Sequence, residues 1–300
     1  MQSPSSRDRI LVRILFLFLL ASTGQATARD LAEIRHAGTL RHLGVPYAAF
    51  VTGAGDGLDV ELMQGFAKDL GVDYEYVPTD WKHVIGDLTG RHAKRGADGH
   101  AQLLEATPIR GDIISNGMTI LDWRKEVVDF ATPSFPTGVW LIARADSILT
   151  PIKPSRDLDT DIGLVKTAMR GRSVLALENT CLDPALYRLE ETGADVRILD
   201  GTRKLNEMAP AILNQVAETT LLDVPDALIA LDKWPGELKV IGPVSNKQVM
   251  APAFRKDSPA LKAAFEDYFR RIRTDGTYLE LVTKYYPTVL LYFPDFFRAP

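Results

Sequence analysis

The feature that most restricts the fold of this chain is a repeated alternation of strand-like and helix-like stretches. Residues 40–45 and 72–77 have the composition of strands, and between them apolar residues recur every fourth position from Leu58 to Leu70. Gly71 follows directly, as glycine often does at the C-terminal end of a helix. Strands that alternate with amphipathic helices are typical of α/β proteins with mostly parallel sheets. We therefore expect an α/β fold.

The same alternation continues towards the C-terminus. Further strands are predicted at 173–177, 194–199, 219–222 and 238–241. With 300 residues the chain has the length of about two domains, yet no low-complexity linker separates two parts of it. We expect two lobes between which the chain crosses in short strands.

Composition excludes several classes of protein. The formal net charge is −4 and no dense run of lysine or arginine is present, which argues against binding to nucleic acid. Cys181 is the only cysteine, so an internal disulfide and a thiolate zinc cluster are excluded, and we expect a small buried packing residue. The five histidines have no metal-ligand spacing, and no phosphate-binding or dinucleotide-binding loop is found. Neither a metal nor a cofactor is expected.

The N-terminus has the pattern of a secretory signal peptide. Three arginines precede an apolar run at 14–21, and Ala26-Thr27-Ala28 offers a cleavage site between small residues. The run is shorter than the roughly 20 residues of a membrane span, and an uncleaved anchor helix is the alternative. No cysteine follows the run, which leaves no lipid anchor. We expect residues 1–28 to be removed and the mature protein to be soluble in the periplasm.

Three segments, in order along the chain, resemble a known family. Residues 116–133, NGMTILDWRKEVVDFATP, are similar to the stretch G-M-T-x-T-x-x-R-x-x-x-V-D-F-S-x-P of the periplasmic solute-binding proteins of family 3, the receptors of polar amino-acid ABC importers. Residues 57–62 and 275–278 are similar to two shorter motifs of that family. The resemblance extends from about residue 31 to residue 286.

The resemblance implies the type 2 periplasmic-binding-protein fold, an α/β architecture of two lobes, each with a mostly parallel sheet flanked by helices. By motif position, the first lobe comprises residues 29–133 and 249–300, and the second comprises 139–244. Two hinge crossings, at 134–138 and 245–248, join them. Open α/β sheets bind ligands at the carboxyl ends of their strands, which in this fold face the cleft between the lobes.

In the first lobe the resemblance assigns ligand-binding roles to Arg124, Thr119 and Gly117. Arg124 stands where the family has the arginine that binds the ligand carboxylate, and a guanidinium can hold both carboxylate oxygens at once. Thr119 matches a hydroxyl donor, and Gly117 matches a position where the backbone approaches the ligand. The alternative for Arg124 is a surface ion pair with Glu126 or Asp129.

In the second lobe Asn179 and Thr180 follow a predicted strand and precede a helix that is expected to begin near Asp183. Amide groups at a helix N-terminus suit a carboxylate, so Thr180 is predicted to be a second clamp on it. Asn179 stands where the family usually has glycine. Asp223 matches the aspartate that accepts the ligand's α-ammonium group, and the alternative is a cap for the helix that follows.

Three aromatic residues fall where the family places the walls of its cleft. Tyr47 and Trp81 are predicted to line the cleft, where stacking on a ligand adds to the burial of apolar area. For Phe50, a place in the cleft wall and a place in the core are equally supported.

Residues 89–110 make the chain longer than the family pattern. The insertion is basic and contains glycine, so we expect an exposed loop. The alternative is that it reaches over the cleft and offers Arg91, Lys94 or Arg95 to an acidic ligand. The aromatic tail at 292–297 lies beyond the usual end of the family and is expected to pack on the first lobe.

The resemblance implies a receptor without enzymatic activity. It would capture an amino acid or a similar small carboxylate as the lobes close, and deliver it to the permease of an ABC importer in the inner membrane. We expect a monomer that binds no nucleic acid. Two alternatives use the same fold: a periplasmic dehydratase of the cyclohexadienyl type, with Asp80 or Glu178 as a candidate proton donor, and a ligand-sensing protein.

Overall fold

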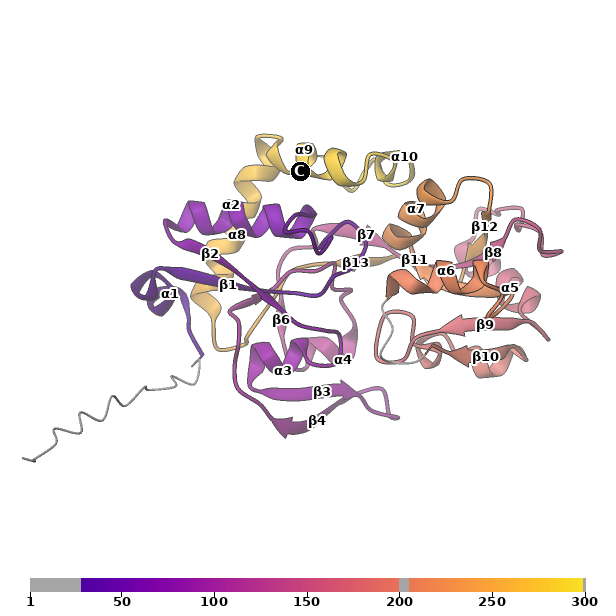
Figure 1. The fold of residues 1–300 in the computed structure, drawn as a ribbon, viewed down its shortest axis with the longest axis horizontal. Helices are drawn as coiled ribbons and strands as arrows, with labels where there is room; N and C mark the ends of the chain where they lie inside the picture. The colour runs from indigo at the N-terminus through magenta and orange to yellow at the C-terminus, as the bar shows by residue number, and fades with distance from the viewer. Residues whose placement is uncertain (1–27, 200–204, 299–300) are drawn as a thin grey trace, which may run out of the picture.

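The computed structural model describes residues 28–199 and 205–298, so the predicted signal peptide lies outside the described residues except for Ala28. The chain forms two lobes that lie next to each other (Figure 1). Within the described part of the chain, no helix has both the length and the apolar character that crossing a membrane requires.

The first lobe is built on a sheet of five strands: β1 (Thr39–Gly44), β2 (Asp73–Pro78), β5 (Ile113–Ile114), β6 (Asp129–Phe130) and β14 (Ala253–Phe254). Their order in the sheet is β2-β1-β5-β14-β6. Helices on both sides of this sheet complete the lobe (Figure 1): α1 (Leu31–Ala37), α2 (Leu58–Leu70), α3 (Val84–Thr89), α4 (Asp122–Lys125), α8 (Pro259–Thr274), α9 (Thr277–Tyr285) and α10 (Val289–Tyr292).

Helix α2 forms where the sequence predicts it. Its buried residues include Leu58, Leu62 and Phe66, and the ring of Phe66 lies 5.3 Å from that of Phe265 on α8. Gly71 ends the helix in the left-handed conformation with φ 73°, which glycine adopts without steric cost. The apolar periodicity of the sequence thus becomes the contact between two helices that are far apart in the chain.

The second lobe is built on another sheet of five strands: β8 (Val139–Arg144), β9 (Ser173–Ala176), β10 (Asp195–Ile198), β11 (Thr219–Asp223) and β12 (Leu238–Pro243). Their order is β10-β9-β11-β8-β12. The helical segments of this lobe are α5 (Leu158–Ala168), η1 (Pro184–Leu186), η2 (Leu189–Thr192), η3 (Leu205–Glu207), α6 (Met208–Leu213) and α7 (Val224–Lys233).

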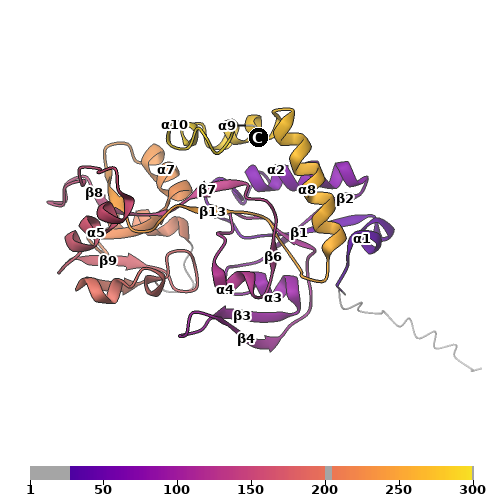
Figure 2. The ribbon, with the colours of Figure 1, turned by 180° about the vertical axis from the view of Figure 1, so that it is seen from behind.

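Two short strands run between the lobes, β7 (Phe135–Thr137) and β13 (Gln248–Met250), and they pair with each other in an antiparallel fashion. Figure 2 shows both strands, seen from behind, between the two sheets. The two-lobed α/β fold predicted from the sequence is confirmed.

Each sheet is mostly parallel, as expected, but contains one antiparallel strand. In the first lobe β14 is antiparallel to β5 and β6, and in the second lobe β8 is antiparallel to β11 and β12. β8 follows β7 and β14 follows β13, so each enters its sheet directly from a crossing strand. Such a strand begins at the edge of the sheet that faces the other lobe, whereas the strands parallel to β1 and β9 end there.

The insertion forms a β-hairpin, so the expectation of an exposed loop is wrong. β3 (Arg91–Arg95) and β4 (Ala101–Ala106) pair in an antiparallel fashion, outside both five-stranded sheets. Ala93 is buried and packs in the smaller hydrophobic cluster of the first lobe together with Val84 and Ile85. One apolar face is therefore enough to fold this basic segment onto α3.

Two other expectations are corrected. Residues 184–192 form the short 3-10 helices η1 and η2 in place of one α-helix, with Arg188 between them at a positive φ of 54°. The aromatic tail contacts both lobes: Arg273 on α8 donates a hydrogen bond of 3.3 Å to the carbonyl oxygen of Phe296, and the ring of Tyr292 lies 6.0 Å from Trp140 on β8. The ring of Phe297 lies 5.6 Å from Phe135 on the crossing strand β7.

Candidate functional site

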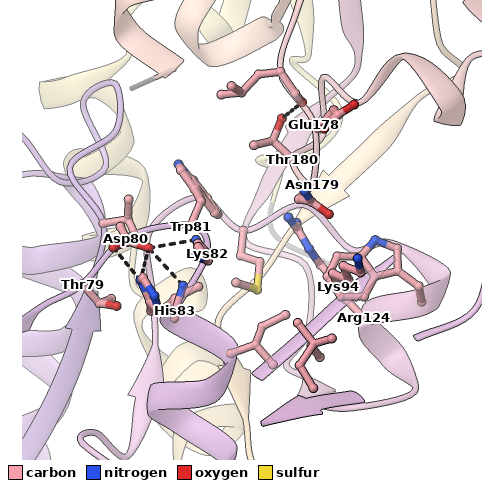
Figure 3. Close-up of a pocket in the computed structure, with 18 of the residues that line it drawn as sticks. Thr79, Asp80, Trp81, Lys82, His83, Lys94, Arg124, Glu178, Asn179 and Thr180 are labelled. Atoms are coloured by element: carbon pink, nitrogen blue, oxygen red, sulfur yellow. Dashed lines mark hydrogen bonds and ion pairs between the residues drawn. The ribbon is translucent and has the colours of Figure 1, made fainter. Parts of the chain in front are cut away.

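A cavity of about 500 Å³ lies between the two lobes. The first lobe contributes residues 45–46 after β1, residues 79–85 after β2, the β3–β4 hairpin and the beginning of α4. The second lobe contributes residues 177–180 after β9. Figure 3 shows Glu178, Asn179 and Thr180 together in one part of the cavity, and Thr79, Asp80 and His83 together in another. Loops at the carboxyl ends of β1 and β9 thus contribute to both walls, where α/β sheets commonly bind ligands.

Arg124 is the buried cation of this cavity. Its side chain belongs to α4, only 2% of the residue is exposed, and its guanidinium carbon lies 5.8 Å from the ring of Trp81 and 5.4 Å from that of Trp123. Nη1 donates a hydrogen bond of 2.9 Å to the carbonyl oxygen of Thr119, and Nε has no partner. Within the described residues no carboxylate forms an ion pair with Arg124.

The alternative of a surface ion pair for Arg124 is wrong. Glu126 instead accepts hydrogen bonds from His100 Nδ1 at 2.8 Å and from the backbone N–H of Ala101 at 2.9 Å. Burial lowers the pKa of Arg124 to about 10, so the guanidinium is still charged at neutral pH. A buried charge without a counter-ion is unfavourable, and an anion that enters the cavity would neutralise it.

Thr119 lies next to Arg124, but neither Thr119 nor Gly117 lines the cavity as the described residues form it. The Thr119 hydroxyl is buried and has no hydrogen-bond partner. Gly117 has φ 67°, and its N–H donates a hydrogen bond of 2.7 Å to Asp59. A Cβ atom at Gly117 would lie 2.4 Å from the ring of Phe50, so core packing already requires glycine here.

The three predicted aromatic residues separate into one cavity residue and two core residues. Trp81 lines the cavity, and its Nε1–H has no hydrogen-bond partner. Phe50 is 1% exposed, and its ring lies 5.0 Å from Phe135 and 5.1 Å from Tyr286, which places it in the core. Tyr47 is 2% exposed and stacks on Phe50 at 5.8 Å.

In the second lobe the loop after β9 has its polar groups bonded internally. The Thr180 hydroxyl donates a hydrogen bond of 2.8 Å to the carbonyl oxygen of Leu177 and accepts one of 3.0 Å from the N–H of Leu182. Asn179 has φ 61°, and its N–H donates a hydrogen bond of 3.1 Å to Asp183. Both Asn179 and Thr180 line the cavity, as the sequence predicts for a binding site, but Thr180 sits at no α-helix N-terminus.

Asp223 lies at the junction of the lobes but does not line the cavity formed by the described residues. It caps α7 by accepting a hydrogen bond of 3.3 Å from the N–H of Asp226, so the helix-cap interpretation holds. It also accepts a hydrogen bond of 3.3 Å from Cys181 Sγ. Burial raises the pKa of Asp223. Asp223 and Arg124 both lie close enough to the Cys181 thiol to act on its pKa, Asp223 raising it and Arg124 lowering it.

Sequence reasoning placed Cys181 in the core and gave no role to Trp123. Cys181 is buried, as expected, but its thiol neighbours Asp223 and Arg124, and burial and the Asp223 carboxylate raise its pKa. The position of Trp123 directly before Arg124 was the available signal for an aromatic face next to the guanidinium.

Two carboxyl groups line the cavity together with Arg124, and both were named from the sequence. Asp80 accepts a hydrogen bond of 2.8 Å from His83 Nδ1 and further ones from the backbone N–H groups of Lys82 and His83. Glu178 belongs to the loop of the second lobe and is exposed. The cavity thus contains both cationic and anionic side chains, of which Asp80 is already engaged.

Comparison with known protein sequences gives three matches of interest. A family model described as bacterial extracellular solute-binding proteins, family 3, matches residues 98–288. The membrane-bound lytic murein transglycosylase F of Desulfosudis oleivorans is 26% identical over 234 residues, which cover 78% of this chain but 44% of that protein. The L-cystine-binding protein TcyJ of Escherichia coli K12 is 27% identical over 233 residues, which cover 77% of this chain and 74% of that protein.

Comparison with solved structures supports the fold. A mutant of ArgBP from T. maritima superposes with a TM-score of 0.66 and 22% identity, covering 86% of this chain and 99% of that one. The ancestral amino acid-binding protein AncCDT-1, described as a precursor of cyclohexadienyl dehydratase, gives a TM-score of 0.64 and 24% identity over 85% of this chain and 98% of that one. At such identities the likeness concerns the fold alone.

Proposed function

The chain belongs to the bacterial extracellular solute-binding proteins of family 3, and on this basis we propose that it is a receptor for an amino acid or a similar small carboxylate. The ligand binds between the lobes and is delivered to an ABC importer. The predicted signal peptide at 1–28 directs the protein to the periplasm, where it acts as a monomer. Similarity to the L-cystine-binding protein TcyJ supports an amino-acid-like ligand.

The observation that carries this proposal is the state of Arg124. Arg124 lines the cavity between the lobes and is only 2% exposed. Two indole rings flank its guanidinium, which has no carboxylate partner among the described residues. Charge-assisted hydrogen bonds to a carboxylate would satisfy Nε and neutralise the charge. The nearby hydroxyl of Thr119 and the Nε1–H of Trp81 are further donors without a partner.

The proposal is tested by thermal unfolding of the purified protein with a panel of amino acids and organic acids. A ligand that binds only the folded state raises the unfolding temperature, so at least one carboxylate should do so. Replacement of Arg124 by alanine should abolish this shift. Arg270→Ala is a matched control, because Arg270 is exposed and pairs with Asp267 on the surface of α8.

Two results would contradict the proposal: no response of the wild-type protein to any carboxylate, or an unchanged response of the Arg124→Ala variant. Delivery to an importer is tested separately in cells. Removal of this protein should reduce uptake of the carboxylate that stabilises it, while uptake of amino acids that do not bind stays the same.

A cyclohexadienyl-type dehydratase is the second candidate, because Asp80 and Glu178 line the same cavity as Arg124. In such an enzyme the arginine would hold the substrate carboxylate and one of the two acids would protonate the leaving hydroxyl. Time-dependent loss of prephenate or arogenate, removed by Glu178→Gln or Asp80→Asn, would favour the enzyme over the receptor. Stable binding without turnover would favour the receptor.

A further inference from the structure

The β3–β4 hairpin is fixed against the first lobe at its base. The imidazole of His92 lies so close to Gly86 on α3 that a Cβ atom there would be 2.2 Å from Nδ1 of the ring. The ring of His83 lies 5.2 Å from that of His92. After the hairpin, the N–H of Thr107 donates a hydrogen bond of 3.0 Å to the carbonyl oxygen of Gly90. The base of the hairpin is therefore packed and hydrogen-bonded.

The turn end of the hairpin is held by Glu126, the residue directly after α4, the helix that carries Arg124. Glu126 accepts hydrogen bonds of 2.8 Å from His100 and 2.9 Å from the N–H of Ala101, at the beginning of β4. The hairpin and the buried guanidinium thus belong to one packed unit, and the hairpin side chains that face the cavity are set in place before a ligand arrives.

Lys94 is the charged residue that the hairpin contributes to the cavity wall, together with the apolar residues Ala93 and Leu104. Arg91 and Arg95, on the same strand, are not among the residues that line the cavity in the described part of the chain. Lys94 itself is exposed, and it has no ion-pair partner within the described residues. Its ammonium group is free to meet a ligand.

Two cations of the cavity lining, Arg124 and Lys94, have no carboxylate partner within the described residues. The lining includes three cations, Lys82, Lys94 and Arg124, and two carboxyl groups, those of Asp80 and Glu178. The hydrogen bond from His83 does not remove the charge of Asp80, so both carboxylates count against the three cations. Within the described residues neither Arg124 nor Lys94 forms an ion pair with a carboxylate, so each of these two cations can take one acidic group of a ligand.

The geometry points to Lys94 as a specificity-determining residue that makes this receptor prefer diacids. Arg124 binds one carboxylate in the buried part of the cavity, and Lys94 binds a second acidic group at its more exposed side. Apolar residues such as Val84, Ile85 and Met118 supply much of the remaining wall, which suits a hydrocarbon segment between the two acids. This inference rests on the proposed function and names its class of ligand.

The test compares dissociation constants for diacids and for monoacids of the same length. Glutarate, adipate and suberate are paired with the corresponding monocarboxylates, and L-glutamate is paired with L-glutamine to show whether an α-ammonium group is required. For the wild-type protein we expect the diacid of at least one pair to bind about fivefold more tightly than its monoacid. A fivefold change corresponds to the free energy of about one solvent-exposed ion pair. Lys94→Ala should remove this preference by weakening diacid binding more than monoacid binding.

Arg91→Ala is the matched control, because it removes the same charge from the same strand at a residue outside the cavity lining. It should keep the diacid preference, and Lys94→Arg should keep it as well. Monoacids that bind as tightly as diacids, or a preference that survives Lys94→Ala, would overturn the inference and leave the proposed function intact. If no carboxylate binds the wild-type protein, the proposed function itself fails.

Discussion

The two lobes treat their buried polar groups differently. In the first lobe, buried polar atoms without a hydrogen-bond partner include Nε1 of Trp81, Nε of Arg124 and the side-chain amide of Asn116. The hydroxyls of Tyr47, Ser115 and Thr119 make no regular hydrogen bond either, although they lie towards Asp223, Asp59 and Cys181, respectively. In the described part of the second lobe, Asp226 Oδ2 is the one such atom. The cavity loop of that lobe bonds its own polar groups through Thr180 and Asp183.

This difference supports the proposal that the two lobes contribute differently to ligand binding. An unsatisfied buried donor or acceptor costs roughly 1–3 kcal/mol, so a cluster of them is retained where a ligand or ordered water completes the bonds. This contrast supports the proposal that the first lobe supplies most of the groups that recognise the ligand. In the second lobe the polar groups of the loop after β9 are already bonded to one another.

The largest expected effect tests whether the buried polar groups of the first lobe lower the stability of the folded protein. Burial raises the pKa of Asp59 to about 7. As pH rises from about 4 to 7 the unfolded chain loses this proton and the folded protein keeps it, so the free energy of unfolding falls. Asp59→Asn should remove up to about 4 kcal/mol of this fall, at 1.36 kcal/mol per pKa unit. Denaturant unfolding across this pH range measures it.

Asn at position 59 still offers a carbonyl oxygen to the N–H of Gly117, so the variant should fold with its loop in place. The free energies of unfolding of variant and wild type should converge towards pH 4 and diverge towards pH 7. Parallel curves would mean that Asp59 titrates as an ordinary carboxyl and that the contrast between the lobes is weaker than described.

The second prediction concerns the charge of Arg124 without ligand. Because this guanidinium is buried and unpaired, replacing it by methionine should stabilise the free protein by about 2 kcal/mol while abolishing carboxylate binding. The measurements are the unfolding temperature without ligand and the dissociation constant with it. A large loss of stability in Arg124→Met would show that the residue is structural and would undermine the recognition role of the first lobe.

A smaller effect is expected for Trp81. Its Nε1–H has no partner in the protein, so Trp81→Phe removes a donor that only a ligand or water can use. We expect about tenfold weaker binding, equal to about 1.4 kcal/mol, and an unchanged unfolding temperature without ligand. Titration calorimetry decides this, and affinity equal to that of the wild type would remove Trp81 from the site.

The smallest effect on binding is expected in the second lobe. The Thr180 hydroxyl is already bonded to Leu177 and Leu182, so Thr180→Ala should change ligand affinity by less than about twofold. The same change should lower stability by about 1 kcal/mol, because the N–H of Leu182 loses its acceptor. A loss of affinity as large as that of Trp81→Phe would show that the second lobe also recognises the ligand.

Much of the fold was predictable because it depends on local pattern. The apolar repeat of α2 and the strands β1, β2 and β9 were placed within a few residues. The direction of β8 and β14 was not predictable, since it depends on which strands follow a crossing directly. Likewise the composition of residues 89–110 predicts a basic loop, because the packing of Ala93 against α3 appears only in the folded structure.

For the candidate site, the sequence by itself determined which residue types are present and in which motif: Arg124 among donors, an aromatic residue at position 81, and polar residues after β9. Only the tertiary structure decided that Phe50 and Tyr47 pack in the core, that Asp223 accepts a hydrogen bond from Cys181, and that Lys94 lines the cavity. The physical reason is that burial, loss of hydration and the pairing of charges arise between segments far apart in the chain, so no local pattern encodes them.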